Sequence, residues 1–119
     1  MAKTSRPAGL SSNGNNGSKW IRPLKRMAIY LRDGFRCVYC TADLRAVKAY
    51  DVTLDHVISG HQAGNHHETN LVTACRSCNS RKADIPVEEF TDYVTLVRVE
   101  KARATDLRPF LALVHSIAK

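Results

Sequence analysis

The chain has 119 residues and a formal net charge of +7, a length that gives one small domain with a modest hydrophobic core. Its apolar fraction of 44% is ordinary for a globular protein, and its apolar runs are far shorter than the roughly 18 residues of a membrane span. The first ten residues lack the apolar stretch of a secretory signal. We therefore expect a cytoplasmic protein without a membrane partner.

The excess positive charge is confined to the first third of the chain. Residues 1–36 hold eight lysines and arginines against a single acidic residue, whereas residues 37–119 hold ten basic and ten acidic residues. Such an asymmetry indicates a polyanion as the partner, most commonly nucleic acid. A solubilising tail is the alternative.

The N-terminal part is predicted to be a tail followed by a helix. Residues 1–19 are rich in Ser, Asn and Gly and are expected to form a disordered basic arm. Pro23 suits the first turn of a helix, and apolar residues follow it at helical spacing until about Gly34. The apolar stripe of this helix is expected to be core, while its basic face is either solvated or in contact with phosphate. That basic face carries Arg22, Lys25, Arg26 and, further on, Arg32.

The middle of the chain is predicted to hold two short strands and a short helix. Residues 51–58 and residues 70–74 are expected to be strands, and residues 76–84 are expected to be helical. Residues 42–50 fit either a short helix or an irregular loop. Residues 59–69 are predicted to be a loop, because they are polar and contain two glycines.

The C-terminal part is predicted to be helical. Pro86 is expected to open a helix that reaches about Lys101. Its expected apolar face consists of Val87, Phe90, Val94 and Val97. Thr105 is the expected N-cap of a last helix over residues 106–118.

All four cysteines occur in two Cys-x-x-Cys pairs, Cys37 with Cys40 and Cys75 with Cys78. Each pair can form a knuckle, and two knuckles complete a tetrahedral Cys₄ zinc site. The alternatives are a redox-active pair and disulfides, which are rare in cytoplasmic proteins. Four thiolates leave the metal no open coordination position, so the zinc is expected to brace the fold and to do no chemistry.

Polar residues between and just after the knuckles suit phosphodiester hydrolysis. Asp55 and His56 are neighbours at the end of a predicted strand, so their side chains must point to opposite faces. The imidazole of His56 suits a general base that faces the attacking water. Asp55 and the amide oxygen of Asn79 suit Mg²⁺ or Mn²⁺, and two protein ligands leave room for water and substrate oxygens.

The ordered runs "RDGFRCVYC", "LDHVISG" and "NLVTACRSCNSRK" resemble an HNH endonuclease of the zinc-braced kind, in the ββα-metal (His-Me finger) superfamily. The resemblance covers about residues 24–84, with Asn79 as the last motif residue, which makes an H-N-N variant. It implies a small α+β fold, a ββα-metal finger with a Cys₄ zinc site between an N-terminal helix and C-terminal helices. It also implies cleavage of DNA to 3′-hydroxyl and 5′-phosphate ends. Asn70 would then be structural and would hold His56 in one orientation.

The resemblance divides the chain into the arm, a nuclease domain at residues 20–85, and a helical extension at residues 86–119 that packs on the same domain. Next to the metal, Lys82 and Arg81 are expected to contact phosphate. Contacts to nucleic acid are also expected from Arg22, Lys25 and Arg26. The loop histidines are expected to be solvated or to touch the substrate; they are His61, His66 and His67.

Three functions compete at this point. The leading hypothesis is a metal-dependent DNA endonuclease. A non-catalytic zinc-knuckle module that binds DNA or RNA is the second, but it has no reason to hold Asp55, His56 and Asn79 together. A nuclease toxin with an immunity partner is the third. A domain of this size offers few elements that read bases, so we expect weak sequence preference or targeting by a partner protein.

Overall fold

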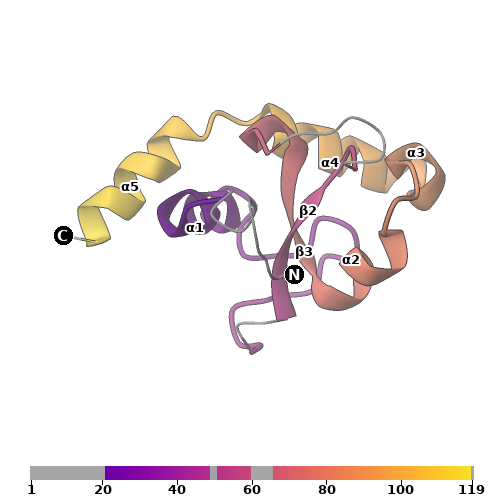
Figure 1. Ribbon diagram of the computed structural model, residues 1–119, viewed down its shortest axis with the longest axis horizontal. Coiled ribbons are helices and arrows are strands. Elements are labelled where there is room, and N and C mark those ends of the chain that lie inside the picture. The colour runs from indigo at the N-terminus through magenta and orange to yellow at the C-terminus, as the bar shows by residue number, and fades with distance from the viewer. Residues whose placement is uncertain (1–20, 49–50, 60–65, 119) are drawn as a thin grey trace.

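The computed structural model describes residues 21–48, 51–59 and 66–118, in which helices surround one two-stranded sheet (Figure 1). The first elements are helix α1 (Pro23–Arg32), strand β2 (Val52–His56), the 3-10 turn η4 (Glu68–Asn70), strand β3 (Leu71–Cys75) and helix α2 (Arg76–Lys82). Three helices follow, α3 (Val87–Phe90), α4 (Tyr93–Ala104) and α5 (Arg108–Ala118). The predicted α+β class is confirmed. The predicted disordered arm lies outside the described residues.

Strands β2 and β3 pair in antiparallel register, with Asp55 opposite Val72 and His56 opposite Leu71. A cluster of buried apolar residues covers each face of this sheet. Leu54 and Leu71 pack with side chains of α1 and α5. Val72 packs on the other face with Cys37, Cys78 and Val99 of α4. The alternation of the strands therefore sends the side chains of Asp55 and His56 to opposite faces.

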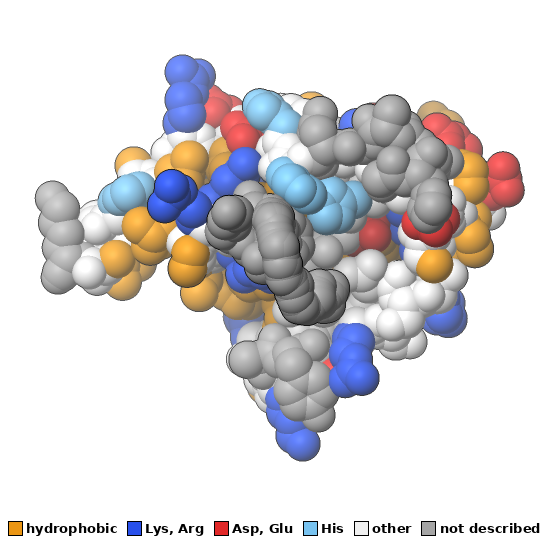
Figure 2. Space-filling view, in the orientation of Figure 1, with side chains coloured by type: hydrophobic (Ala, Val, Ile, Leu, Met, Phe, Trp, Pro, Cys, Tyr) orange, Lys and Arg blue, Asp and Glu red, His pale blue; other side chains and the backbone are white. Residues whose placement is uncertain are grey.

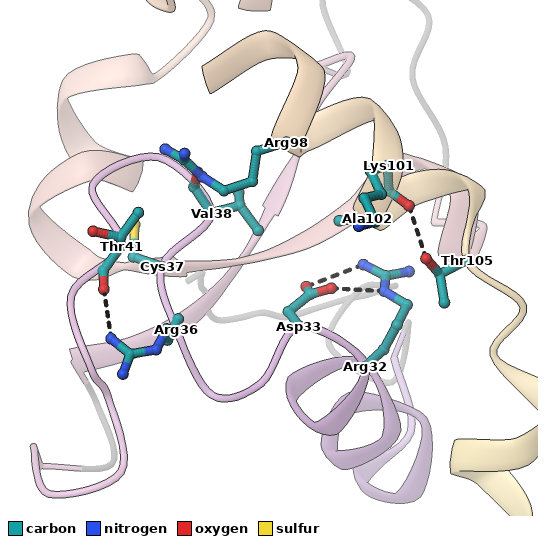
Figure 3. A pocket seen from close by; sticks show the side chains of 10 residues that line it. All are labelled: Arg32, Asp33, Arg36, Cys37, Val38, Thr41, Arg98, Lys101, Ala102 and Thr105. Atoms are coloured by element: carbon teal, nitrogen blue, oxygen red, sulfur yellow. Dashed lines mark hydrogen bonds and ion pairs between the residues drawn. The ribbon is translucent and has the colours of Figure 1, made fainter. Parts of the chain in front are cut away.

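A buried ion pair at the end of α1 covers the outer edge of β3. Arg32 donates to Asp33 over 2.8 Å, and both side chains are fully buried (Figure 3). The prediction that Arg32 lies on the exposed basic face of this helix is therefore wrong. Asp33 also accepts the N–H of Thr73 at 2.8 Å, and the carbonyl of Thr73 accepts the N–H of Val38 at 3.0 Å. These bonds replace the missing strand partner and leave the edge of β3 without exposed polar groups at this residue.

The prediction of one helix from Pro86 to Lys101 is wrong, because the chain breaks between α3 and α4. Thr91 is extended, and its hydroxyl donates to the carbonyl of Val87 at 2.6 Å. Asp92 then caps α4 by accepting the N–H of Thr95 at 2.8 Å. An aspartate that satisfies a free N–H group in this way starts a new helix.

The break also changes which residues of this segment are buried. Val94 and Val97 of α4 are exposed, against the prediction that they form the apolar face. Val99 is buried instead, and Leu96 and Ala102 pack against the same cluster. The apolar periodicity of α3 does not continue into α4, because the extended residue Thr91 separates the two helices.

The predicted N-cap of the last helix is also wrong. Helix α5 begins at Arg108, and Thr105 is the C-cap of α4, with its hydroxyl donating to the carbonyl of Lys101 at 2.8 Å. The carboxylate of Asp106 accepts the N–H of Arg108 at 3.0 Å. Asp106, two residues before the helix, thus supplies the side-chain acceptor for the first helical N–H group, a role that was predicted for the threonine.

The predicted first helix, the two strands and the short helix after them are confirmed to within a few residues, whereas residues 60–65 of the predicted loop lie outside the described residues. Residues 41–48 are irregular, with one bridge between Arg36 and Asp43. In the part of the chain that the structure describes, no helix is long and apolar enough to cross a membrane.

Candidate active site and metal centre

The four cysteines converge into one cluster beside β3. Their Sγ atoms all lie within 4.8 Å of one another, and the Sγ atoms of Cys40 and Cys75 are 3.9 Å apart. A tetrahedral zinc ion with bonds of about 2.3 Å spaces its sulfur ligands by about 3.8 Å. The four thiols are free, and the cluster fits the predicted Cys₄ zinc site.

Local hydrogen bonds and burial shape the chemistry of this cluster. The backbone N–H of Cys40 points to the Sγ of Cys37 at 3.5 Å, and that of Cys78 to the Sγ of Cys75 at 3.4 Å. Burial raises the pKa of the Cys37 and Cys78 thiols. Without metal both thiols are therefore protonated at neutral pH, and binding of zinc must release their protons.

Asp55 is a buried carboxylate held by side chains from two other segments. Its Oδ2 accepts a 2.5 Å hydrogen bond from the Tyr39 hydroxyl and lies 3.4 Å from the ammonium of Lys82. Burial raises the pKa of Asp55, and the positive charge of Lys82 opposes this shift. Burial and the nearby Asp55 carboxylate raise the pKa of Tyr39 far above its usual range, so its hydroxyl remains the donor.

Lys82 is fully buried at the end of α2. Its ammonium donates to the carbonyls of His56 and Val57 at 3.1 Å each and pairs with Asp55. A buried ammonium with three internal acceptors does not reach a bound phosphate, so the structure does not support the predicted phosphate contact. Lys82 instead ties the end of α2 to the end of β2. Arg81, the other predicted contact on α2, is exposed.

The side chain of His56 lies on the face of β2 opposite to that of Asp55, as the alternation of a strand predicts. Its Nε2 lies 2.8 Å from the Nδ1 of His66, and the ring centroids are 4.9 Å apart. Burial, together with the neighbouring His66, Lys82 and Arg26, lowers the pKa of His56 to about 4. The imidazole of His56 is therefore neutral at pH 7, as a general base must be.

Asn70 is a buried amide that closes the loop after β2. Its Oδ1 accepts the N–H of Ile58 at 2.8 Å, and its Nδ2 donates to the carbonyl of Ile58 at 2.9 Å. Its own carbonyl accepts the N–H of Val57 at 2.9 Å. These three bonds fix the backbone directly after His56.

Asn79, in the first turns of α2, contacts β2 just before Asp55. Its Nδ2 donates to Thr53 Oγ1 at 2.9 Å and to the carbonyl of Leu54 at 3.3 Å. Among the described residues its amide oxygen has no hydrogen-bond partner. The first turns of a helix also direct N–H groups and a positive dipole end toward any phosphate bound there.

The donor set around Asp55 and Asn79 fits a hard divalent ion. Tyr39 and Lys82 both engage Oδ2 of Asp55, which leaves Oδ1 for a ligand. One anionic and one neutral oxygen suit Mg²⁺ or Mn²⁺. Within the described ranges, only the cysteine cluster groups three or more Cys, His, Asp or Glu ligands. A divalent ion here would take its other ligands from water and substrate.

Basic side chains of α1 border the histidine pair. Figure 2 shows histidine side chains gathered on one face beside lysine and arginine side chains. Lys25 donates to the carbonyl of His66 at 3.1 Å, and Arg26 donates to the Tyr30 hydroxyl at 3.1 Å. Arg22 is exposed just before the helix. The predicted basic face of this helix therefore adjoins His56.

A second basic region lies on the other edge of the sheet. It is a cavity of about 220 Å³, and its lining includes Arg36, Arg98 and Lys101 (Figure 3). Thr73 and Leu54 are opposite each other in the sheet. The backbone N–H and carbonyl of Thr73 bond Asp33 and Val38, which line this cavity, whereas the carbonyl of Leu54 accepts from Asn79. The cavity is therefore separate from the candidate active site.

Sequence reasoning missed two contacts of the site. The hydroxyl of Tyr39, which lies inside the first cysteine pair, reaches Asp55. His66 was expected to be solvated or to touch substrate, but it contacts His56. The position of Tyr39 inside the knuckle was the available signal for the first contact; no local pattern indicated the second. His67 caps the turn η4 by accepting the N–H of Thr69, and His61 lies outside the described residues.

These features define a class of protein, a small α+β domain with a cysteine metal cluster behind a strand–strand–helix unit. Residues 37–84 match the family model described as HNH endonuclease. The matched segment includes both cysteine pairs, β2, β3 and α2. No curated protein and no solved structure shows significant similarity to the chain.

Proposed function

We propose that the protein is a metal-dependent endonuclease that hydrolyses phosphodiester bonds of DNA in the cytoplasm. One observation supports this most directly. Asp55 and His56 leave the end of β2 on opposite faces, with Asn79 tied to the same strand, inside the segment that matches the HNH family. A non-catalytic zinc-knuckle module needs neither a buried carboxylate nor a neutral imidazole at this position.

His56 is the general base of the proposed reaction. Its neutral imidazole takes a proton from water, the water oxygen attacks phosphorus, and the bond to the 3′-oxygen breaks. The products are 3′-hydroxyl and 5′-phosphate ends. Because Nε2 faces His66 in the free protein, water reaches this nitrogen only after the His66 ring turns away. Asn70 keeps the backbone next to His56 in place.

Asp55 and Asn79 would hold the catalytic Mg²⁺ or Mn²⁺. When bound, this ion supplies positive charge to the phosphate and to the leaving oxygen. The four cysteines would hold a separate zinc ion, which has no open position and braces the two knuckles. The basic residues Arg22, Lys25, Arg26 and Arg81 would contact the DNA backbone. Such contacts position DNA but do not read its sequence, so a partner protein would direct targeting.

A plasmid-nicking assay tests this proposal. The wild-type protein should nick supercoiled plasmid with Mg²⁺ or Mn²⁺ and not with EDTA. His56→Ala should lower the rate about 10²–10⁴-fold, the usual contribution of a general base. His115→Ala is the matched control, because His115 is exposed on α5 and should leave the rate unchanged. A non-catalytic module would instead retard the plasmid in a gel without nicking it under any of these conditions.

A further inference from the structure

We infer that Tyr39 is a positioning residue for the catalytic ion, and that helices α3 and α4, outside the segment matching the HNH family, hold it in place. This inference rests on the proposed function, because it concerns the same ion site. Phe90 and Arg98 contact Tyr39, and Tyr39 in turn contacts Asp55.

Two buried partners fix the orientation of the Asp55 carboxylate. The Tyr39 hydroxyl and the Lys82 ammonium approach the same oxygen, Oδ2, at 2.5 Å and 3.4 Å. Both partners are buried, as is Asp55 itself. Rotation of the carboxylate would break a short hydrogen bond in a poorly solvated place, which is costly. The carboxylate is therefore held in one orientation, with the other oxygen, Oδ1, left for a ligand.

Tyr39 is itself held by contacts with α3 and α4. Its ring meets the ring of Phe90 edge to face, with centroids 5.4 Å apart and planes at 83°. Arg98 of α4 donates to the carbonyl of Val38 at 2.7 Å and to the carbonyl of Tyr39 at 3.2 Å. Figure 3 shows the Arg98 side chain beside Val38. The aromatic ring and the backbone of Tyr39 are thus both held from α3 and α4.

Tyr39 lies inside the segment that matches the HNH family, whereas Phe90 and Arg98 lie outside it. Tyr39 stands between Cys37 and Cys40, so zinc binding fixes the same loop that Arg98 holds. The match to the HNH family ends at residue 84, before Phe90 and Arg98. Residues of this chain beyond the family segment therefore act on the ion site through Tyr39.

The test is Mn²⁺ binding to the zinc-loaded protein without DNA, followed by electron paramagnetic resonance. Tyr39→Phe should weaken Mn²⁺ binding by about tenfold or more, since a hydrogen bond to a charged group typically contributes at least that factor. Its zinc content should stay at one equivalent. Tyr30→Phe is the matched control, because Tyr30 is also buried and its hydroxyl donates to β2, at the carbonyl of Val52 (3.3 Å), away from Asp55. This control should bind Mn²⁺ like the wild type.

A second pair of variants tests the role of α3. Phe90→Leu keeps the Tyr39 hydroxyl but removes the edge-to-face contact, so it should weaken Mn²⁺ binding in the same direction by a smaller factor. Val94→Ala, at an exposed position on α4, should have no effect. If Tyr39→Phe does not fold, as circular dichroism would show, Phe90→Leu decides the question alone, and unchanged Mn²⁺ affinity in that variant then overturns the whole inference.

Each outcome bears on the inference. Wild-type Mn²⁺ affinity in Tyr39→Phe would overturn it, and so would a wild-type protein whose Mn²⁺ binding is unchanged by Asp55→Asn. Unchanged affinity in Phe90→Leu would remove the part played by α3. Because binding is measured without DNA, a protein that binds Mn²⁺ through Asp55 and Tyr39 but never nicks plasmid would refute the proposed function and leave this inference standing.

Discussion

The Nε2 atom of His56 lies 2.8 Å from the Nδ1 atom of His66, so the two imidazoles share a hydrogen bond. At this separation one ring must donate and the other must accept, which requires that at least one ring is neutral. The partial burial of His56 and the cations around it favour the neutral form of His56. This pairing makes the protonation state of His56 sensitive to folding.

The stability of the protein should therefore fall as the pH falls below about 6.5. The pKa of His56 is about 4 in the folded state and 6.5 in its ordinary state. Between these values the unfolded chain binds more protons, so stability rises with pH across this window. At about 1.4 kcal/mol per pKa unit, the full effect is at most about 3 kcal/mol.

Urea unfolding at pH 6.5, 5.5 and 4.5, without added Mg²⁺ or Mn²⁺, measures this dependence. The same series on His56→Asn supplies the control, because other groups, such as the zinc thiolates, titrate alike in both proteins. The wild type should lose more stability than the variant over this range. Parallel curves for the two proteins would show that His56 keeps an ordinary pKa.

Lys82→Met should destabilise the fold strongly. The change removes the buried ammonium that faces Asp55 and two carbonyls, and so leaves a buried carboxylate without its counter-charge. Breaking one side of such a pair typically costs about 3–5 kcal/mol. Adding Asp55→Asn to Lys82→Met should restore part of this loss. Chemical denaturation of the single and double variants measures both values; a single-variant loss below about 1 kcal/mol would mean that the pair is solvated.

The sequence was sufficient to predict the parts of the site that depend on spacing along the chain. Two Cys-x-x-Cys pairs predict a four-thiolate cluster because the spacing of each pair already positions two ligands. The period of a strand likewise places Asp55 and His56 on opposite faces. These features follow from local geometry, and the structure has them.

Contacts between distant segments could not be predicted in this way. The hydroxyl of Tyr39 reaches Asp55 only because the knuckle packs on one face of β2. Lys82 looked like a surface cation beside a phosphate, but the packing of α2 on β2 buries it. In the C-terminal part, the cap at Asp92 overrides the apolar period that predicted one continuous helix. Each of these features depends on the local cap or on which distant segments pack together, and the periodicity of apolar residues carries no information about either.

Replacing a cysteine of the cluster should act through folding. In Cys78→Ser the protein should lose its equivalent of zinc and much of its tertiary structure, because the free energy of metal binding at such a site is also free energy of folding. Ser77→Ala, at the exposed neighbouring position, is the control. Zinc content and near-ultraviolet circular dichroism measure the outcome. A folded, zinc-free and fully active Cys78→Ser protein would contradict a bracing role for the metal.

The basic face beside the histidine pair should set the affinity for DNA without setting the rate of cleavage. Arg22→Ala and Lys25→Ala remove two charges of the basic face, of which Lys25 lies beside His66, and leave every proposed catalytic group in place. Each phosphate contact on duplex DNA contributes about 0.9 to the slope of log affinity against log salt concentration. The double variant should therefore bind more weakly, with a slope that is shallower by up to about 1.8.

Arg108→Ala is the matched control for this experiment, since Arg108 is exposed on α5 and pairs with Asp106 at 2.8 Å. It should keep the wild-type slope. Titrations with one duplex at several salt concentrations give all three slopes, and turnover at saturating DNA should be equal in the three proteins. If the double variant keeps the wild-type slope, Arg22 and Lys25 do not contact DNA, and the charge of this helix serves only solubility.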